Sequence, residues 1–235
     1  GGAAEAPRAD DDGDEAEAPP TTEAKAPPVE IPPELAGLPA PHTAAAMGNL
    51  EKLKSLAELE PTLLFSFDIA HRSPLFYAVA YSQVDITSYL LDANPELVDT
   101  VDAHGDTLLH AAASTGSDTC LELVILQLEH KYGDNKADMS AKNQMGMTPA
   151  HLAQNAACLQ LLYEHGGDMG VLDNNRRSPL FIACAMDRID CAEYLIECLD
   201  HDETAIYAQD IRGDTPLHAS ACNGAVDCLL MLLQY

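Results

Sequence analysis

A short motif recurs six times along this 235-residue chain, and its spacing constrains the fold more than any other feature does. In its fullest form the motif reads Thr215-Pro216-Leu217-His218. Counted from the position of the threonine, the copies begin at Pro39, Ser73, Thr107, Thr148, Ser178 and Thr215. Successive copies are therefore separated by 34, 34, 41, 30 and 37 residues. A period of about 33 residues predicts stacked helix pairs that form a solenoid.

The residue types within each copy have local physical reasons. Thr or Ser at the first position is suited to cap a helix, because its side-chain oxygen accepts a hydrogen bond from an unpaired amide. Proline follows where its missing N–H is harmless, at the first helical position. Glycines such as Gly116 and Gly224 stand where the short helix should end. In the last five copies a turn-forming side chain lies five residues before the threonine position, at Asp68, Asp102, Asn143, Asp173 and Asp210.

The longer pattern resembles a known family. The copy at Thr107 continues with alanines to Gly116 and then with an apolar segment, Cys120-Leu121-Glu122-Leu123-Val124, and the copy at Thr215 keeps the same order. This order is similar to that of ankyrin repeat proteins, and the resemblance covers residues 39–235. It implies an all-α solenoid of helix-turn-helix pairs with β-turn or hairpin tips. It also implies that partners bind to the tips and to the first helix of each pair.

The chain divides by composition into a tail and a repeat domain. Residues 1–36 contain ten acidic residues against Arg8 and Lys25, with few large apolar side chains, so we predict a disordered tail. The tail fits a solvated linker, or an acidic segment that attracts a basic partner. Residues 37–235 form the predicted ankyrin repeat domain. The segment from Met231 to Tyr235 has the apolar pattern of a second helix with no polar terminal repeat after it, so we expect the last repeat to be truncated within a longer protein.

Two kinds of departure from the pattern mark individual regions. The copy at Thr148 is short and reaches its second helix, near Cys158, about three residues early. Extra residues lie around 130–136 and again at 201–204, and such insertions are expected to form surface loops. We expect these regions to distinguish the chain from other arrays of the same kind.

Composition excludes several classes of function. A formal net charge of −26 argues against nucleic acid, whose recognition needs Lys and Arg at phosphates, and against anionic membrane surfaces. No apolar run approaches the roughly 18 residues of a membrane-spanning helix. Seven cysteines without paired short spacings indicate a reducing compartment, the cytoplasm or the nucleus. The sequence leaves the oligomeric state open and favours a monomer.

The residues that invite metal or catalytic chemistry fit structural roles instead. One inward-facing position, equivalent from repeat to repeat, is cysteine in four copies: Cys120, Cys158, Cys191 and Cys228. Neighbouring cysteines lie one repeat apart, on the order of 10 Å, which is too far for them to share a zinc ion. The histidines at His110, His151 and His218 also share one position, which is Phe in two other copies. A triad of Ser73, His71 and Asp68 fails because Ser73 is predicted to cap a helix. We therefore predict no catalytic, cofactor-binding or metal-binding residues.

Candidate partner-binding residues lie at the turn tips and on the first helices. Arginines are concentrated in the last two copies, where they would suit an acidic or phosphorylated segment. Exposed tyrosine and methionine side chains are common anchors at interfaces, although Tyr77 fits internal packing equally well. The candidates are Arg72, Tyr77, Tyr81, His104, Met145, Met147, Arg176, Arg177, Arg188 and Arg212.

The sequence therefore predicts a non-enzymatic interaction scaffold. Its mechanism would be the binding of a partner peptide or domain by a preformed surface made of tips and inner helices. The alternative is a regulatory or targeting segment of a larger signalling enzyme whose catalytic domain lies outside these residues. By analogy with the family, such a domain would be a kinase, an Arf GTPase-activating module or a ubiquitin ligase.

Overall fold

The computed structural model describes residues 32–133, 137–200 and 203–235, and these residues contain six successive helix pairs. The inner helices are α1 (Ala40–Ala46), α3 (Pro74–Ala80), α5 (Leu108–Thr115), α7 (Pro149–Leu152), α9 (Pro179–Ala185) and α12 (Pro216–Asn223). The outer helices are α2 (Leu50–Leu59), α4 (Val84–Ala93), α6 (Asp118–Tyr132), α8 (Ala156–Glu164), α10 (Ile189–Cys198) and α13 (Val226–Leu232). The remaining elements are η1 (Pro33–Leu35), η2 (Pro61–Phe65), η3 (Pro95–Asp99) and α11 (Glu203–Ile206).

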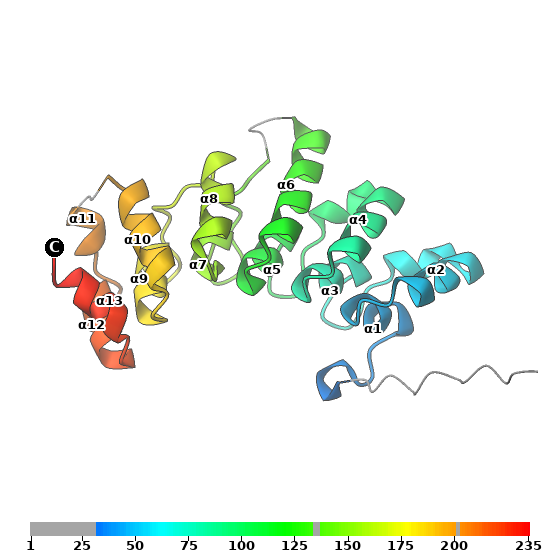
Figure 1. Cartoon of the computed structure of the whole chain (residues 1–235), viewed down its shortest axis with the longest axis horizontal. Helices are drawn as coiled ribbons and strands as arrows, with labels where there is room; N and C mark the ends of the chain where they lie inside the picture. The colour runs from blue at the N-terminus through cyan, green and yellow to red at the C-terminus, as the bar shows by residue number, and fades with distance from the viewer. Residues whose placement is uncertain (1–31, 134–136, 201–202) are drawn as a thin grey trace, which may run out of the picture. The chain divides into compact units, whose positions relative to one another are not determined.

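The helix pairs stack in chain order, as Figure 1 shows by its colours from blue to red. Each inner helix contacts the next inner helix, from α1 to α12, and the outer helices from α4 onward do the same. One buried apolar cluster runs between the two layers and includes the four cysteines of the shared position. In the described residues the only β-type pairing outside the helices is a single bridge between Val101 and Thr107. The predicted all-α solenoid is confirmed.

The inner helices begin where the capping residues predict. Ser73 Oγ accepts the backbone N–H of Phe76 at the start of α3, and Ser178 Oγ accepts that of Phe181 at the start of α9. At α5, Thr107 and His110 form a reciprocal pair, in which the Thr107 backbone N–H also donates to His110 Nδ1 at 3.2 Å. Gly116 ends α5 in the left-handed conformation, with φ = +70°. Local sequence thus sets both ends of this helix.

The first repeat lacks this reciprocal cap and leaves a buried atom unpaired. His42 is fully buried, and its Nε2 lies 2.9 Å from the Arg72 carbonyl oxygen. The residue at the capping position is Pro39, which has neither a hydroxyl group nor a backbone N–H to offer. Among the described residues, His42 Nδ1 is a buried side-chain atom without a hydrogen-bond partner. Burial also lowers the pKa of His42, against smaller raising effects of the Arg72 carbonyl and Asp68.

The fourth repeat is short in its inner helix. The helix α7 has four residues, and Gln154 and Asn155 then bond to the previous repeat instead of extending it. The Gln154 backbone N–H donates to Ala113 O, and Asn155 Nδ2 donates to Gly116 O. The insertion before this repeat lengthens α6 to 15 residues. Residues 134–136 of the insertion lie outside the described residues. The second insertion contributes α11, beginning at Glu203.

The predicted disordered tail falls almost wholly on residues 1–31, which lie outside the described residues. At its C-terminal edge the prediction is wrong. Residues Pro33–Leu35 form η1, and Leu35 is 2% exposed within the main apolar cluster. The composition of the first 36 residues concealed this side chain because it is one leucine in an otherwise polar and proline-rich segment. Its burial in this cluster stabilises the ordered start.

The unpaired His42 Nδ1 generates a stability prediction. We expect Pro39→Thr to be about 1 kcal/mol more stable than Pro39→Ala, because threonine supplies the reciprocal cap seen at Thr107. Comparison with alanine cancels the effect of removing proline from the unfolded chain. Urea unfolding of the full chain measures the difference. The gain should disappear when His42 is changed to Phe, and a gain that persists there would contradict the role of Nδ1.

A second prediction concerns two tip glycines with positive φ. Gly146 has φ = +75°, and a Cβ on it would lie 2.8 Å from the Asn174 backbone nitrogen, whereas Gly213 has φ = +87° and open space around it. Gly213→Ala should destabilise the domain by about 1 kcal/mol through backbone conformation alone. Gly146→Ala should destabilise the domain by at least about 2 kcal/mol, because the neighbouring tips must also move apart to make room for the Cβ. Equal losses in thermal unfolding would show that the tips do not pack as described.

Candidate functional site

The turn tips are each closed by one side-chain oxygen. Asp102 Oδ1 accepts the backbone N–H groups of His104 at 2.8 Å and of Asp106 at 3.0 Å. The Asp102 backbone N–H donates to Asp106 O, and the Gly105 N–H donates to Asp102 O. The same four bonds recur, shifted by one repeat each time, in the turns that begin at Asp68, Asn143, Asp173 and Asp210. The tips are therefore rigid hairpin-like turns and not loose loops.

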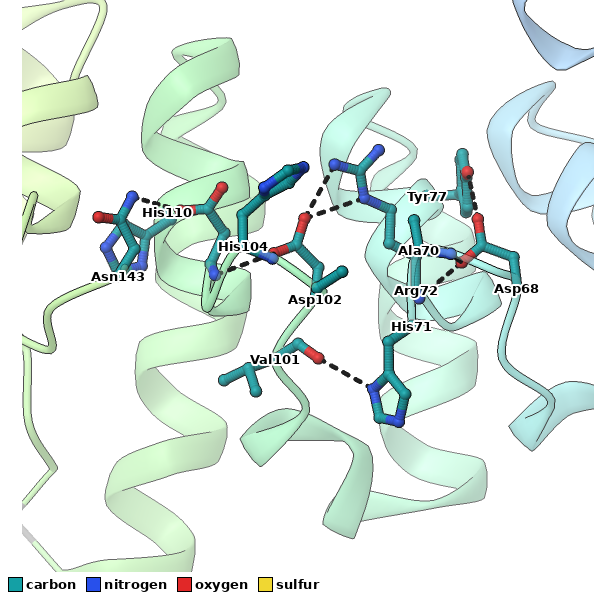
Figure 2. Close-up of polar contacts among 12 residues, drawn as sticks. Asp68, Ala70, His71, Arg72, Tyr77, Val101, Asp102, His104, His110 and Asn143 are labelled. Carbon is teal, nitrogen blue, oxygen red and sulfur yellow. Dashed lines mark hydrogen bonds and ion pairs between the residues drawn. The ribbon is translucent and has the colours of Figure 1, made fainter. Parts of the chain in front are cut away.

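The second carboxylate oxygen of a tip aspartate takes a side-chain donor. Figure 2 shows Arg72 donating through Nε and a terminal nitrogen to Asp102 Oδ2 in the next tip, at 3.1 and 2.8 Å. The Tyr77 hydroxyl donates to Asp68 Oδ2 at 2.8 Å. Burial alone would raise the pKa of Asp102, but the bonds from Arg72 and the tip amides outweigh it and lower the pKa. Burial and the Asp68 carboxylate together raise the pKa of Tyr77 to about 12.

Backbone hydrogen bonds join each tip to its neighbour. The residue after each tip aspartate or asparagine donates its N–H to a carbonyl of the preceding tip. Four such bonds connect five tips, at 2.8 to 3.0 Å: Ala103 to Ala70, Gln144 to His104, Asn174 to Met145, and Ile211 to Asn175. The tips thus form one bonded row, and the residues they expose keep fixed relative positions.

The shared histidine position adds a second connection between repeats. The Nε2 atoms of His110 and His151 lie 3.0 Å from the carbonyl oxygens of Met147 and Arg177 in the following tips. Because their Nδ1 atoms accept backbone N–H groups of threonine, Nε2 carries the proton and donates. Burial lowers the pKa of both histidines, which favours this neutral form. The predicted structural role of these histidines rests on these bonds.

Half of the candidate partner-binding residues hold the fold together. Arg72 and Arg177 pair with Asp102 and Asp173, whose side chains are fully buried. Arg188 donates to the Ala153 carbonyl at 2.9 Å, beyond the end of the short helix α7. Tyr77 is 8% exposed, and Met147 is 9% exposed. Arg177 meets Asp173 within its own turn, whereas the partners of Arg72 and Arg188 lie in a neighbouring repeat, which sequence alone does not reveal.

The other half are accessible to a partner. Tyr81 is 39% exposed and Met145 is 57% exposed, the latter at a tip. His104, Arg176 and Arg212 are exposed tip residues. Arg176 has φ = +61°, at a position that is glycine in three other tips. A large side chain is uncommon in this conformation, so we consider the Arg176 side chain a candidate for function. The structure does not gather all five at one place, because Tyr81 comes from the second repeat and Arg212 from the sixth.

A groove lies between α9 and α12, and only some of its lining residues were among the candidates from the sequence. Its volume is about 350 Å³, and its floor is apolar, with Phe181, Ile182 and Ala219 nearly buried. These three residues and Met147 form an apolar cluster separate from the main core. The rim is polar and includes two of the candidate arginines: Arg177, Asp210, Arg212, Asp214, His218, Cys222 and Asn223. The sequence did contain one sign of this groove: Ala219 is small, whereas the equivalent residues of the second and fifth repeats are Tyr77 and Ile182.

The cysteines have the environment of packing residues. Cys120, Cys158, Cys191 and Cys228 are each at most 1% exposed. Burial raises the thiol pKa of Cys158 to about 12 and that of Cys191 to about 11, so neither forms a thiolate readily. Within the described residues no group of three or more His, Cys, Asp or Glu side chains is arranged to hold a metal ion. Across the same residues, every helix is too short or too polar to span a bilayer.

Known proteins are similar to this chain in sequence or in structure. Over 183 residues the chain is 30% identical to the nuclear factor NF-kappa-B p105 subunit of Gallus gallus, covering 74% of this chain and 18% of that protein. It is 29% identical to the probable 26S proteasome regulatory subunit p28 of Saccharomyces cerevisiae, covering 82% and 83%. The human ASB11 ankyrin repeat domain superimposes with a TM-score of 0.67 at 25% identity, covering 84% of each chain.

The family match extends over most of the chain. The model for ankyrin repeats (three copies) matches residues 41–135, 126–205 and 153–235, so it includes all six helix pairs except the first residue of α1. The bonded row of tips, the capped inner helices and the stacked pairs are the structural counterparts of that match. The chain belongs to the ankyrin repeat family.

Proposed function

We propose that this domain is a scaffold that binds a partner on the tips and inner helices of its fourth to sixth repeats. Ankyrin repeats mediate protein–protein interaction and form a non-catalytic fold. The observation that carries the proposal is the bonded row of tips, which holds the exposed Arg176 and Arg212 in fixed positions. Binding then needs little reordering of the protein, and preorganised surfaces bind with a smaller loss of entropy.

The proposed partner presents an acidic or phosphorylated segment. Arg176 and Arg212 have no side-chain hydrogen bond within the described part of the chain, whereas Arg177 and Arg188 are engaged internally. A free guanidinium at a fixed position binds a carboxylate or phosphate in a charge-assisted way. We therefore assign partner contact to Arg176 and Arg212, together with Met145, and give Arg177 and Arg188 structural roles.

A second candidate function has the domain as the targeting or regulatory segment of a larger protein. The observation in its favour is length, because the chain spans 18% of the p105 relative. In that arrangement any catalytic activity would belong to residues outside this chain. The 83% span of the proteasome subunit relative favours the simpler scaffold. We further propose a monomeric state and a cytoplasmic or nuclear setting.

The charge of the tips provides the test of the scaffold proposal. Arg176→Glu combined with Arg212→Glu should reduce the recovery of cross-linked partners from cells about tenfold or more, because two attractive contacts become repulsive. Quantitative mass spectrometry of full-length protein measures the recovery. The matched control reverses the exposed Lys52 and Lys54 on α2, which changes net charge equally and leaves the tips intact. Unchanged recovery of every partner in the tip variant would contradict the assignment.

A further inference from the structure

The bonded row of tips has an open end at its first member. In each later tip, the residue after the turn-closing Asp or Asn donates its backbone N–H to the preceding tip, as Ala103 does to the Ala70 carbonyl at 2.8 Å. In the first tip the corresponding donor is Ile69 N–H, and the carbonyl in the matching register is that of Ala36, 33 residues earlier, like Ala70 before Ala103. Neither group has a hydrogen-bond partner in the part of the chain that the structure describes.

The residues that precede α1 are described and do not form a tip. At the position where the later copies have the turn-closing Asp or Asn, the chain has Glu34. Residues Pro33–Leu35 form η1, after which the Leu38 N–H donates to the Leu35 carbonyl. Leu35 is buried in the main apolar cluster, which fixes this segment in a course unlike that of a tip. The open end is therefore a consequence of the structure of residues 33–38.

A groove lies where the row of tips is interrupted. Its volume is about 480 Å³, and two segments line it: Ala36, Gly37, Leu38 and Pro39 before α1, and Phe67, Asp68 and Ile69 at the first tip. Phe67 is 42% exposed and Ile69 is fully exposed. The charged group of this lining, the Asp68 carboxylate, already accepts the Tyr77 hydroxyl and two amides of its own turn. The groove thus offers apolar side chains and unpaired backbone groups without a free charge.

An extended backbone matches this arrangement. Such a chain carries N–H and C=O groups on both of its edges, so one segment can accept from Ile69 and donate to Ala36. Unpaired backbone groups at the end of a hydrogen-bonded row are a template for pairing with another extended chain. An apolar side chain placed against Phe67 and Ile69 removes apolar surface from water on both molecules. The bound segment would continue the row by one member.

We propose that an extended, uncharged segment of a partner protein occupies this groove. One of its carbonyls accepts the Ile69 N–H, one of its N–H groups donates to the Ala36 carbonyl, and an aliphatic or aromatic side chain contacts Phe67. The site lies at the end of the stack next to α1, blue in Figure 1, and none of its lining residues belongs to an inner helix. It does not depend on the proposed contacts of the tip arginines.

Exchange of the Ile69 amide provides the test. Full-length protein selects binders from a random library of peptides of about 12 residues, and amide exchange is followed by NMR with each enriched peptide. The Ile69 amide should exchange rapidly in the free protein and at least tenfold more slowly in the complex, because the peptide carbonyl accepts its hydrogen bond. The Ala103 amide, which is already bonded, should change little. If no selected peptide protects Ile69, the proposal is wrong.

Two pairs of variants locate the contacts by fluorescence anisotropy with the protecting peptide. Ile69→Pro removes the donor and Ile69→Ala keeps it, and proline suits the second position of this turn, in which the Asp68 carbonyl accepts the His71 N–H. The proline variant should bind about fivefold more weakly than the alanine variant. Ala36→Leu fills the groove and should weaken binding at least tenfold, whereas Ala93→Leu, exposed on α4, should not change it.

Circular dichroism confirms that each variant is folded. Equal affinities within either pair would place the peptide elsewhere and contradict the groove site. Protection of the Ile69 amide that rises with protein concentration in the absence of peptide would assign the groove to a second copy of the chain and refute the partner segment.

The amide readout also separates this inference from the scaffold proposal, because a peptide held only by Arg176 and Arg212 leaves Ile69 unprotected. If a peptide protects Ile69 and the arginine variant retains all partners, the groove inference stands and the charge assignment fails. If partner recovery depends on the arginines and no peptide protects Ile69, the scaffold stands and the groove inference fails.

Discussion

The side-chain oxygen that closes each turn is the interaction on which the rest of the structure depends. One oxygen of Asp102 fixes two amides of its own tip, and each such bond contributes on the order of 1 kcal/mol net. Its larger effect is geometric, because a tip held in one conformation presents its next N–H to the neighbouring tip. The bond from Ala103 to Ala70 exists only if both turns are closed. The hydrogen bonds within each turn thereby position the amides that join neighbouring repeats.

The connections between repeats vary while the tips remain constant. Histidine bridges the third repeat to the fourth and the fourth to the fifth, through His110 and His151. After the second repeat, whose corresponding residue is Phe76, the bridge is the ion pair between Arg72 and Asp102. The shortened fourth repeat relies on Arg188, which donates to the Ala153 carbonyl. A row that tolerates such exchange can vary its exposed residues without losing its shape, and this property suits a binding surface.

Sequence reasoning succeeded where a single repeat determines the outcome. The caps at Ser73 and Thr107, the turn aspartates and the short helix α7 follow from residues close together in the chain. It failed where residues of different repeats meet. Arg72 was a candidate for partner contact, yet it pairs with Asp102 in the next tip, thirty residues away. The groove at Ala219 required knowledge of which side chains from α9 face α12, and a period alone does not provide that.

Hydrogen exchange of the tip amides tests the central claim most directly. The amides of Ala103, Gln144, Asn174 and Ile211 should exchange slowly, with protection close to that of the inner helices, because each donates to the preceding tip. The amide of Ile69 provides an internal control, since it occupies the same position but has no such acceptor in the described part of the chain, and it should exchange rapidly. Rapid exchange of all five amides while the helices stay protected would show that the tips are loose and that the row does not exist.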